Sequence, residues 1–237
     1  MKRFISTLLL LSVVLWSATQ AMAFKPAVLF DMGGKFDKSF NEGIWNGLEK
    51  FRKETGIKYR EFEVQQEAQR EQFLRKLAKR GSDPILAVGF GQASAVEKIA
   101  KEFPNTRFSI IDVNWLNAPN IQGIAFKEQE GSFLVGVLAA MKSETGKVGF
   151  VGGMDIPLIH KFACGYVQGV KYINSGATVY QKMTGTTPAA WSDPARGAQL
   201  AKTMFASGAV IVYAAAGSTG LGVLHAAAAN VMFSIGV

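Results

Sequence analysis

The chain has 237 residues, of which 49% are hydrophobic and 19% are charged, and its formal net charge at pH 7 is +8. This is the composition of an ordinary globular protein, and it excludes disorder as the main state. Lysine and arginine mingle with glutamate, as in residues 67–80, and no segment has a basic stripe with interleaved aromatic residues. The pattern indicates solvated helix faces and argues against a nucleic-acid-binding protein.

The first 23 residues have the order of a secretory signal peptide. A cationic pair at residues 2–3 precedes the apolar run 4–16, and Ala-Met-Ala follows at 21–23. The run is shorter than the about 20 residues that a membrane-spanning helix needs, and a small-x-small cleavage site follows it. We expect cleavage after Ala23, which gives a periplasmic mature chain with no stable membrane insertion. An uncleaved membrane anchor is the alternative.

From Lys25 onward, short β-branched or aromatic runs alternate with longer amphipathic stretches. This alternation predicts an α/β protein in which crossover helices join the strands of a parallel sheet. Ser39, with Glu42 three residues later, predicts a capping box at the start of the first helix. In the first half we expect strands at 27–31, 58–64, 85–90 and 107–113, and helices at 39–55, 67–79 and 93–102.

The same alternation repeats in the second half. We expect strands at 147–151, 178–183, 210–214 and 231–235, and helices at 132–142, 159–173, 194–206 and 219–229. The repeat predicts two lobes, an N-terminal lobe of residues 24–125 and a C-terminal lobe of residues 126–237, with a hinge crossing at 120–130. Because a strand with no helix after it leaves one face of a parallel sheet uncovered, we expect the second lobe to be truncated at Val237.

The chain contains one cysteine, Cys164, so no intrachain disulfide can form. Because it lies in the apolar stretch 162–166, we expect a small buried side chain and not a catalytic thiol. No cysteine stands at the expected cleavage point, which excludes a lipid anchor attached there. We therefore expect a mature protein that is free in solution and monomeric.

The densest cluster of polar and glycine residues is 31–41, where the first predicted strand leads into the first predicted helix. In open α/β sheets ligands bind at such carboxyl ends of strands, and the start of a helix offers free N–H groups. A turn that only caps a helix would use the same residue types. The expected capping and loop-supporting residues are Gly33, Gly34, Asp37 and Ser39, together with Gly217 in a second strand-to-helix turn.

Other kinds of site fit poorly. Gly33 and Gly34 are adjacent and Lys35 is followed by phenylalanine, so the spacing of a phosphate-binding loop is missing. His160 and His225 stand alone in helical stretches, which indicates neither a metal site nor a nucleophile-base pair. We expect no cofactor, no metal and no catalytic residue.

Residues 31–41 resemble the corresponding segment of the basic membrane protein family, the purine-nucleoside receptor group of ABC transporter substrate-binding proteins. Further parts that resemble this family are 131–140, 149–154, Phe162 with 165–170, 191–194 and 214–217, and the resemblance covers 25–237. It implies a type I periplasmic-binding-protein fold, with two lobes that close around a nucleoside for delivery to an ABC permease. It also implies that the protein is not an enzyme.

The resemblance implies a base sandwiched by one aromatic side chain from each lobe. Phe40 matches the first aromatic position, Tyr213 is the expected second, and Trp191 is the reserve candidate. Asp31 and Asn41 match polar positions of the family's pocket, and Asp112 is a further candidate. Stacking would supply base-tolerant affinity, while carboxylates and amides would select ribose hydroxyls and the base edge.

Family members continue beyond the equivalent of 235–237 with an aspartate-containing turn that binds ribose, and later with a pocket lysine. Three alternatives therefore stay open beside the nucleoside receptor. The first is a receptor for another sugar-containing solute or signal molecule. The second is an exported nucleoside hydrolase that uses Asp31 or Asp37 as its base. The third is a truncated, non-functional copy.

Overall fold

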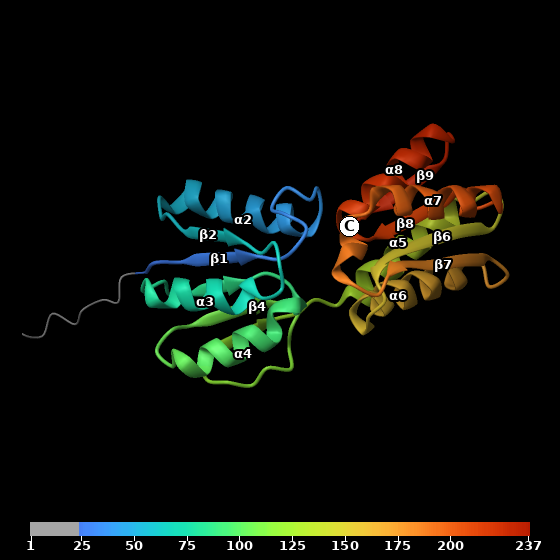
Figure 1. Ribbon diagram of the computed structural model, residues 1–237. Coiled ribbons are helices and arrows are strands. Elements are labelled where there is room, and N and C mark those ends of the chain that lie inside the picture. Colours follow the sequence, from blue (N-terminus) through green and yellow to red (C-terminus); the bar gives the residue numbers. More distant parts are fainter. Residues whose placement is uncertain (1–23) are drawn as a thin grey trace, which may run out of the picture.

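The computed structural model describes residues 24–237 and arranges them as two lobes, each built on its own parallel sheet (Figure 1). The predicted signal peptide and its cleavage after Ala23 lie outside the described residues. Within residues 24–237, no helix is both long and apolar enough to cross a membrane. The predicted α/β class, with two mainly parallel sheets flanked by helices, is confirmed.

The first lobe has a five-stranded sheet in the order β2-β1-β3-β4-β5, and all neighbouring strands are parallel. The central strand β1 is buried along its whole length, as the uninterrupted apolar sequence Ala-Val-Leu-Phe requires. The strands are β1 (Ala27–Phe30), β2 (Arg60–Glu63), β3 (Ile85–Ala87), β4 (Phe108–Ile111) and β5 (Ile121–Ile124). The helices are α2 (Phe40–Thr55), α3 (Gln69–Lys79) and α4 (Ala93–Glu102), with a 3-10 turn, η2, at Phe90–Gln92.

The helices cover both faces of this sheet. One core cluster packs α3 and α4 against one face, through side chains such as Leu74 and Ile99. Val28, Phe30 and Val88 point to the other face, where the apolar side of α2 covers them. Strand β5 lies inside the segment that was predicted to be the hinge crossing, so the crossing begins only after Ile124.

The second lobe has a four-stranded parallel sheet in the order β7-β6-β8-β9. Helices α5 and α6 pack on one face, around Phe150 and Tyr166, and helices α7 and α8 pack on the other, around Met204 and Val223. The strands are β6 (Lys147–Met154), β7 (Thr178–Gly185), β8 (Ile211–Ala215) and β9 (Phe233–Gly236). The helices are α5 (Glu128–Lys142), α6 (Pro157–Ile173), α7 (Pro194–Ala206) and α8 (Gly220–Ala229), with 3-10 turns η3 (Pro188–Trp191) and η4 (Gly217–Thr219).

Glycines let the helices of the second lobe touch backbone to backbone. At the α5–α6 crossing, a Cβ added at Gly136, Gly165 or Gly169 would run into a carbonyl oxygen of the facing helix. The α7–α8 contact is built in the same way, because a Cβ at Gly222 would meet the carbonyl of Pro194. Such close packing fixes the distance between the helices and leaves no room for a side chain.

Cys164 and an apolar patch are two notable features of the second lobe's surface. Cys164 is exposed on α6, where its Sγ accepts a hydrogen bond of 3.1 Å from Gln168 Nε2, because α6 turns its neighbours Ala163 and Tyr166 to the core instead. The expected burial of this cysteine is therefore wrong.

Leu134, Leu138 and Met141 on α5 are exposed, as is Phe233 on β9, so this lobe presents an apolar surface along these two elements.

Candidate functional site

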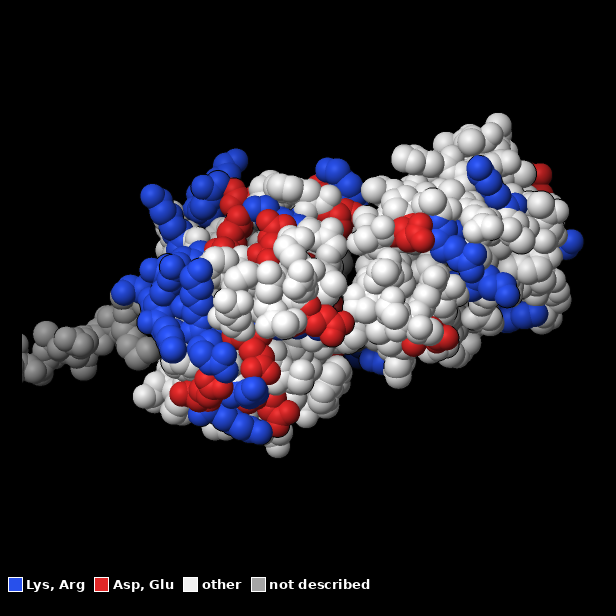
Figure 2. Space-filling view, in the orientation of Figure 1, with Lys and Arg blue, Asp and Glu red and all other residues white. Residues whose placement is uncertain are grey.

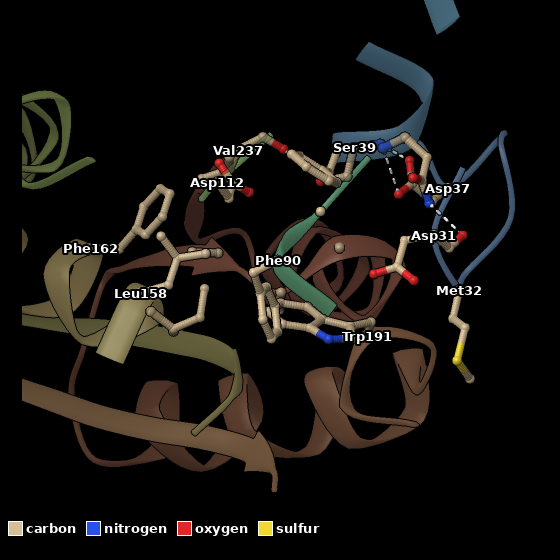
Figure 3. Close-up of a pocket in the computed structure, with 17 residues that line it drawn as sticks. Asp31, Met32, Asp37, Ser39, Phe90, Asp112, Leu158, Phe162, Trp191 and Val237 are labelled. Carbon is tan, nitrogen blue, oxygen red and sulfur yellow. Dashed lines mark hydrogen bonds between the residues drawn. The ribbon is translucent and has the colours of Figure 1, made fainter. Parts of the chain in front are cut away.

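A cleft between the two lobes is lined by 17 residues from both sheets (Figure 3). Its empty volume, which includes space open to solvent, is about 700 Å³. The first lobe contributes the turn after β1, the start of α2 and the ends of β3 and β4. The second lobe contributes the start of α6, the turn η3 and the end of β8. Each sheet therefore faces the cleft with the carboxyl ends of its strands.

Most of the predicted site residues lie in this cleft. The lining includes Asp31, Asp37, Ser39, Phe40, Asn41 and Asp112 from the first lobe, and Trp191 and Gly217 from the second. Gly33 and Gly34 are not lining residues. Their φ angles of +113° and +84° show that they turn the chain between β1 and α2, in a backbone region that favours glycine.

Tyr213 lies in the core of the second lobe and is not among the lining residues. It is only 3% exposed, its ring packs against Phe150 and Tyr166, and its hydroxyl lies 3.3 Å from Ser132 Oγ. Side chains alternate along a strand, and this position on β8 faces α5 and α6 instead of the cleft. The structure does not support the predicted stacking role for Tyr213, whereas Trp191, the reserve candidate, lines the cleft.

Several lining residues were not predicted, and most of them are apolar. Phe90 comes from η2 at the end of β3, and Leu158 and Phe162 come from the first turns of α6 (Figure 3). Each of these residues follows a strand that ends at the cleft, and this position in the chain is the signal by which the sequence could have identified it. A search for polar side chains passes over these residues, although apolar and aromatic groups form most of the surface of typical small-molecule sites.

Asp37 caps helix α2. Its carboxylate accepts hydrogen bonds from the backbone N–H groups of Ser39, Asn41 and Glu42, at 2.9, 3.0 and 3.1 Å. The predicted capping box is wrong, because Ser39 makes no side-chain hydrogen bond to the helix and its Oγ donates to the carbonyl oxygen of Val237, 3.0 Å away. A carboxylate two residues earlier in the turn reaches more of the free N–H groups than a serine hydroxyl can.

The capping role of Asp37 gives a direct prediction. We expect Asp37→Ala to lower the free energy of unfolding by about 1–2 kcal/mol, because it leaves N–H groups at the start of α2 without acceptors. Ser39→Ala is the matched control and should change it by less than about 0.5 kcal/mol. Chemical denaturation of both variants measures the difference. A larger loss for Ser39→Ala than for Asp37→Ala would contradict this assignment.

Asp31 and Arg70 form an ion pair at the first-lobe side of the cleft. Arg70 extends from α3 and places Nη2 3.1 Å from Asp31 Oδ1, with both side chains largely buried. Burial raises the pKa of the Asp31 carboxyl, and the guanidinium of Arg70 opposes that rise. A Cβ at Gly89 or Gly91 would lie 3.0–3.1 Å from Asp31 Oδ2, so the glycines there make room for the carboxylate. The pair thus holds a carboxylate in place at the cleft.

Asn41 braces the turn that carries this carboxylate. Only 2% of Asn41 is exposed, and its Nδ2 donates to the carbonyl oxygens of Gly34, at 3.1 Å, and Asp31, at 3.4 Å. One side chain thereby joins the end of β1, the glycine turn and the first turn of α2. The backbone around Asp31 is therefore held by hydrogen bonds from within the predicted cluster 31–41.

Trp191 is held in position at the opposite side of the cleft. Its backbone carbonyl accepts a hydrogen bond of 2.8 Å from Ser218 Oγ, and the neighbouring Ala190 carbonyl accepts one of 2.8 Å from Thr219 Oγ1. The indole ring packs on Gly153 of β6, where an added Cβ would lie 2.9 Å from Trp191 Cη2 and nearer still to other ring atoms. The ring orientation is therefore set by η4 and by a glycine of the neighbouring strand.

Asp112 lies where the two lobes join, at the end of β4, with a φ of +65°. Burial and the negative charge of Glu128 raise the pKa of its carboxyl and Lys161 opposes the rise, so that the pKa lies at about 6. Lys161 Nζ also lies 3.5 Å from Glu128 Oε2. Charged groups from β4, α5 and α6 therefore face one another at this junction.

The raised pKa of Asp112 predicts a pH-dependent stability. In the folded state the carboxyl keeps its proton up to about pH 6, whereas in the unfolded chain it loses the proton near its ordinary pKa of 3.8. Its charge therefore costs no stability below about pH 4, and stability is lost as the pH rises through 6. After a discount for partial exposure, we expect Asp112→Asn to stabilise the protein by about 1–2 kcal/mol at pH 8 and not at pH 4. Melting curves at both values test it, and an equal difference at both would contradict it.

Comparison of the sequence with known proteins identifies the family of this chain. The profile of the family described as "ABC transporter substrate-binding protein PnrA-like" matches residues 24–237. The chain belongs to this family. It is 34% identical over 205 residues to the "CD4+ T-cell-stimulating antigen" of Listeria monocytogenes, with 84% of this chain and 56% of the relative covered. It is 32% identical over 209 residues to the "ABC transporter nucleoside-binding protein BmpA" of Lactococcus lactis, with 86% and 58% covered.

A solved structure also matches the fold of this chain. The ABC transporter solute-binding protein of Aeropyrum pernix is 31% identical and superposes with a TM-score of 0.80, covering 90% of this chain and 61% of that one. The expected membership of the basic membrane protein family is thus confirmed. The chain spans less than two thirds of the length of these relatives. The family profile matches residues 24–237, which include both sides of the cleft.

Proposed function

We propose that this PnrA-like protein binds a purine nucleoside in the cleft between its lobes and delivers it to an ABC permease without chemical change. The observation that carries the proposal is the pairing in one cleft of aromatic side chains from both lobes with carboxylates at the ends of the first-lobe strands. A nucleoside has the matching chemistry, a flat base with two π-faces and a ribose with hydroxyl donors.

The aromatic part of the cleft suits the base. Phe40 lies at the start of α2, and Trp191 lies in η3 of the other lobe. A base between two such rings gains stacking energy of about 0.5–1.5 kcal/mol for each ring beyond the area that it buries. Stacking alone tolerates any base, so the preference for a purine rests on the larger flat surface that a purine offers to both rings.

The polar part suits the ribose and the base edge. Asp31 and Asp112 place carboxylate oxygens in the cleft, and ionised carboxylates only accept hydrogen bonds. Ribose hydroxyls and base N–H groups are donors, so each can satisfy a carboxylate that the closing lobes remove from water. Free phosphate or a nucleotide would bring further negative charge to the same carboxylates and is disfavoured.

The hydrolase alternative is weaker for a structural reason. A general base needs a carboxylate that is free to take a proton, and Asp37 already accepts three backbone hydrogen bonds as the cap of α2. Asp31 Oδ1 is already paired with Arg70 Nη2 at 3.1 Å. Both carboxylates are better placed to hold the turn and a ligand than to move protons.

Transport requires that the protein meets the solute outside the cytoplasm. The signal-peptide pattern at residues 1–23 supports export, and we propose a periplasmic location after cleavage. Within the described residues one crossing joins the two lobes, which can open and close by a hinge motion, and closure around the ligand would present both lobes to the permease together. The binding site would then empty into the transporter when the lobes separate.

Thermal melts with guanosine, inosine, adenosine, uridine and ribose test the proposal. A purine nucleoside at about a hundredfold above its dissociation constant should add about 2.7 kcal/mol to the free energy of unfolding. Trp191→Ala should remove most of this gain, and Trp115→Ala, at an exposed tryptophan outside the cleft lining, is the matched control. Each variant is compared with its own ligand-free melt.

The other outcomes decide between the alternatives. A shift with ribose that equals the shift with nucleosides would favour a receptor for another sugar-containing solute. Release of free base during incubation would show a hydrolase. A cooperative melt that no nucleoside shifts would overturn the proposed function, as would equal ligand shifts in the Trp191→Ala and Trp115→Ala variants.

A further inference from the structure

The first lobe gathers basic side chains at the end opposite the cleft. This end, the basic pole, consists of the amino ends of the first-lobe strands and the carboxyl ends of helices α2, α3 and α4. Eleven exposed lysine and arginine residues lie there beside five acidic residues, and Figure 2 shows the blue atoms massed at this end, next to the start of the described chain. The basic residues are Lys25, Lys50, Arg52, Lys53, Lys58, Arg60, Lys76, Lys79, Arg80, Lys101 and Arg107, and the acidic ones are Glu49, Glu54, Asp83, Glu97 and Glu102.

The basic pole holds more positive charge than the rest of the molecule together. Without Lys2 and Arg3, the chain's net charge of +8 becomes +6 for residues 24–237. Eleven cations against five anions give the pole +6, so the remainder of the described chain, which includes the cleft, has a net charge of zero. The molecule therefore has a strong charge asymmetry from the pole toward the cleft and second lobe.

Most of this charge is not neutralised within the lobe. Among the described residues, seven of the eleven cations have no carboxylate oxygen within 4.0 Å: Lys25, Lys53, Lys58, Arg60, Lys76, Lys79 and Arg80. The other four cations pair with Glu49, Glu54, Asp83 and Glu97, whereas Glu102 pairs with Arg75, outside the pole. Like charges placed this close repel one another, and an anionic partner would relieve that repulsion.

Helix electrostatics explain only part of the arrangement. Cations in the last turn of a helix complement its dipole, which accounts for Arg52, Lys53, Lys76, Lys79 and Lys101. Lys25, Lys58, Arg60 and Arg107 instead lie at or just before the starts of strands, where no helix dipole favours a cation. The parallel topology brings these two sets to one end, and their sum is a broad positive surface.

We propose that the basic pole docks the protein on a membrane surface that contains anionic phospholipids. A membrane is an extended anionic plane, and it attracts exposed lysine and arginine side chains without a shaped pocket. The pole lies at the amino ends of the strands, whereas the cleft lies at their carboxyl ends, so docking there leaves the cleft open to solvent. Attraction of this kind would hold the protein close to the membrane while it captures its ligand.

Vesicle co-sedimentation tests the proposal. The full-length chain is expressed for export, and the first residue of the purified protein is identified by mass spectrometry. We expect binding to phosphatidylcholine vesicles that contain about 30% phosphatidylglycerol, little binding to pure phosphatidylcholine, and strong weakening when salt rises from 0.1 to 0.5 M. Each basic residue close to an anionic surface should strengthen binding about fivefold.

Charge-neutral variants locate the surface. The triple variant Lys53→Gln, Lys58→Gln and Lys79→Gln should weaken vesicle binding about a hundredfold. The matched control, Lys182→Gln, Arg196→Gln and Lys202→Gln, removes the same charge from exposed positions of the second lobe and should bind almost as the unchanged protein does. Melting curves of both triple variants show whether they are folded.

Three results would overturn the proposal. The first is equal binding to anionic and zwitterionic vesicles, which would indicate an apolar contact. The second is an equal loss in both triple variants, which would indicate an effect of net charge alone. The third is binding to a soluble polyanion such as heparin without binding to anionic vesicles, which would indicate a partner other than a membrane.

Discussion

Replacing Gly169 with alanine is expected to lower the free energy of unfolding by about 3 kcal/mol or more. Gly169 lies on α6 against α5, and an added Cβ would lie 2.8 Å from the carbonyl carbon of Phe133, 2.9 Å from the backbone nitrogen of Val137 and closer still to the Phe133 carbonyl oxygen. These are backbone atoms, so no side chain can swing away and the helices must separate. Overpacking of a rigid contact costs about 1–3 kcal/mol and occasionally more.

The same substitution at Gly47 should have the opposite sign. Gly47 lies in the middle of α2, where a Cβ would meet no atom within 4 Å. Alanine there should raise the free energy of unfolding by about 0.5–1 kcal/mol, because glycine loses more conformational freedom in a helix. Chemical denaturation of the two variants compares them directly. A shift of both in the same direction would mean that the backbone contact between α5 and α6 does not control the stability of the second lobe.

The fold could be predicted from the sequence because its signals are local. Strand β1 is an uninterrupted apolar run, and α2 ends at Gly56, whose φ of +73° few other residues adopt readily. Strand β5 was missed because its sequence, Ile-Gln-Gly-Ile, is short, polar at one position and glycine at another. Its side chains alternate between half-buried and exposed, as expected at the edge of a sheet, and a hinge segment has a similar composition.

The candidate site could be predicted only as far as its polar residues. The cluster 31–41 was found because glycines and acceptors gather between a strand and a helix. The preference for Tyr213 over Trp191 has no support in the structure, because it depends on which face of β8 a side chain occupies and on the short turn η3. The predicted capping box at Ser39 was wrong for a related reason, since Ser39 and Asp37 are both good capping residues and only the path of the turn decides which of them caps the helix.

The basic pole was not visible in the sequence. Its cations are scattered from Lys25 to Arg107, and in each stretch acidic residues dilute them. Only the parallel arrangement places the starts of the strands and the ends of the helices at one end of the lobe. The sequence therefore showed a mixed charge pattern, while the structure gathers many of the cations at one end of the first lobe (Figure 2).

Arg70→Met should lower the free energy of unfolding by about 2–4 kcal/mol at pH 8. The change leaves the largely buried Asp31 carboxylate without its cation, and an unpaired buried charge is costly. The loss should be somewhat reduced because Arg70 Nε is itself buried and has no hydrogen-bond partner among the described residues. Arg75→Met, on the same helix, removes an exposed ion pair with Glu102 and should cost less than about 1 kcal/mol.

The pH dependence of this loss separates charge from packing. Without Arg70, the pKa of Asp31 rises further, because burial already raises it and the guanidinium no longer opposes the rise. The penalty applies only while Asp31 is ionised in the folded state, so it is full at pH 8 and shrinks as the pH falls toward about 4, where the carboxyl is also protonated in the unfolded chain. Denaturation of Arg70→Met at pH 8 and pH 5 should therefore show a smaller loss at pH 5, and the added change Asp31→Asn should restore most of the stability lost at pH 8. A loss that is the same at both pH values, and that Asp31→Asn does not restore, would mean that Arg70 acts through packing alone and does not hold a charged carboxylate at the cleft.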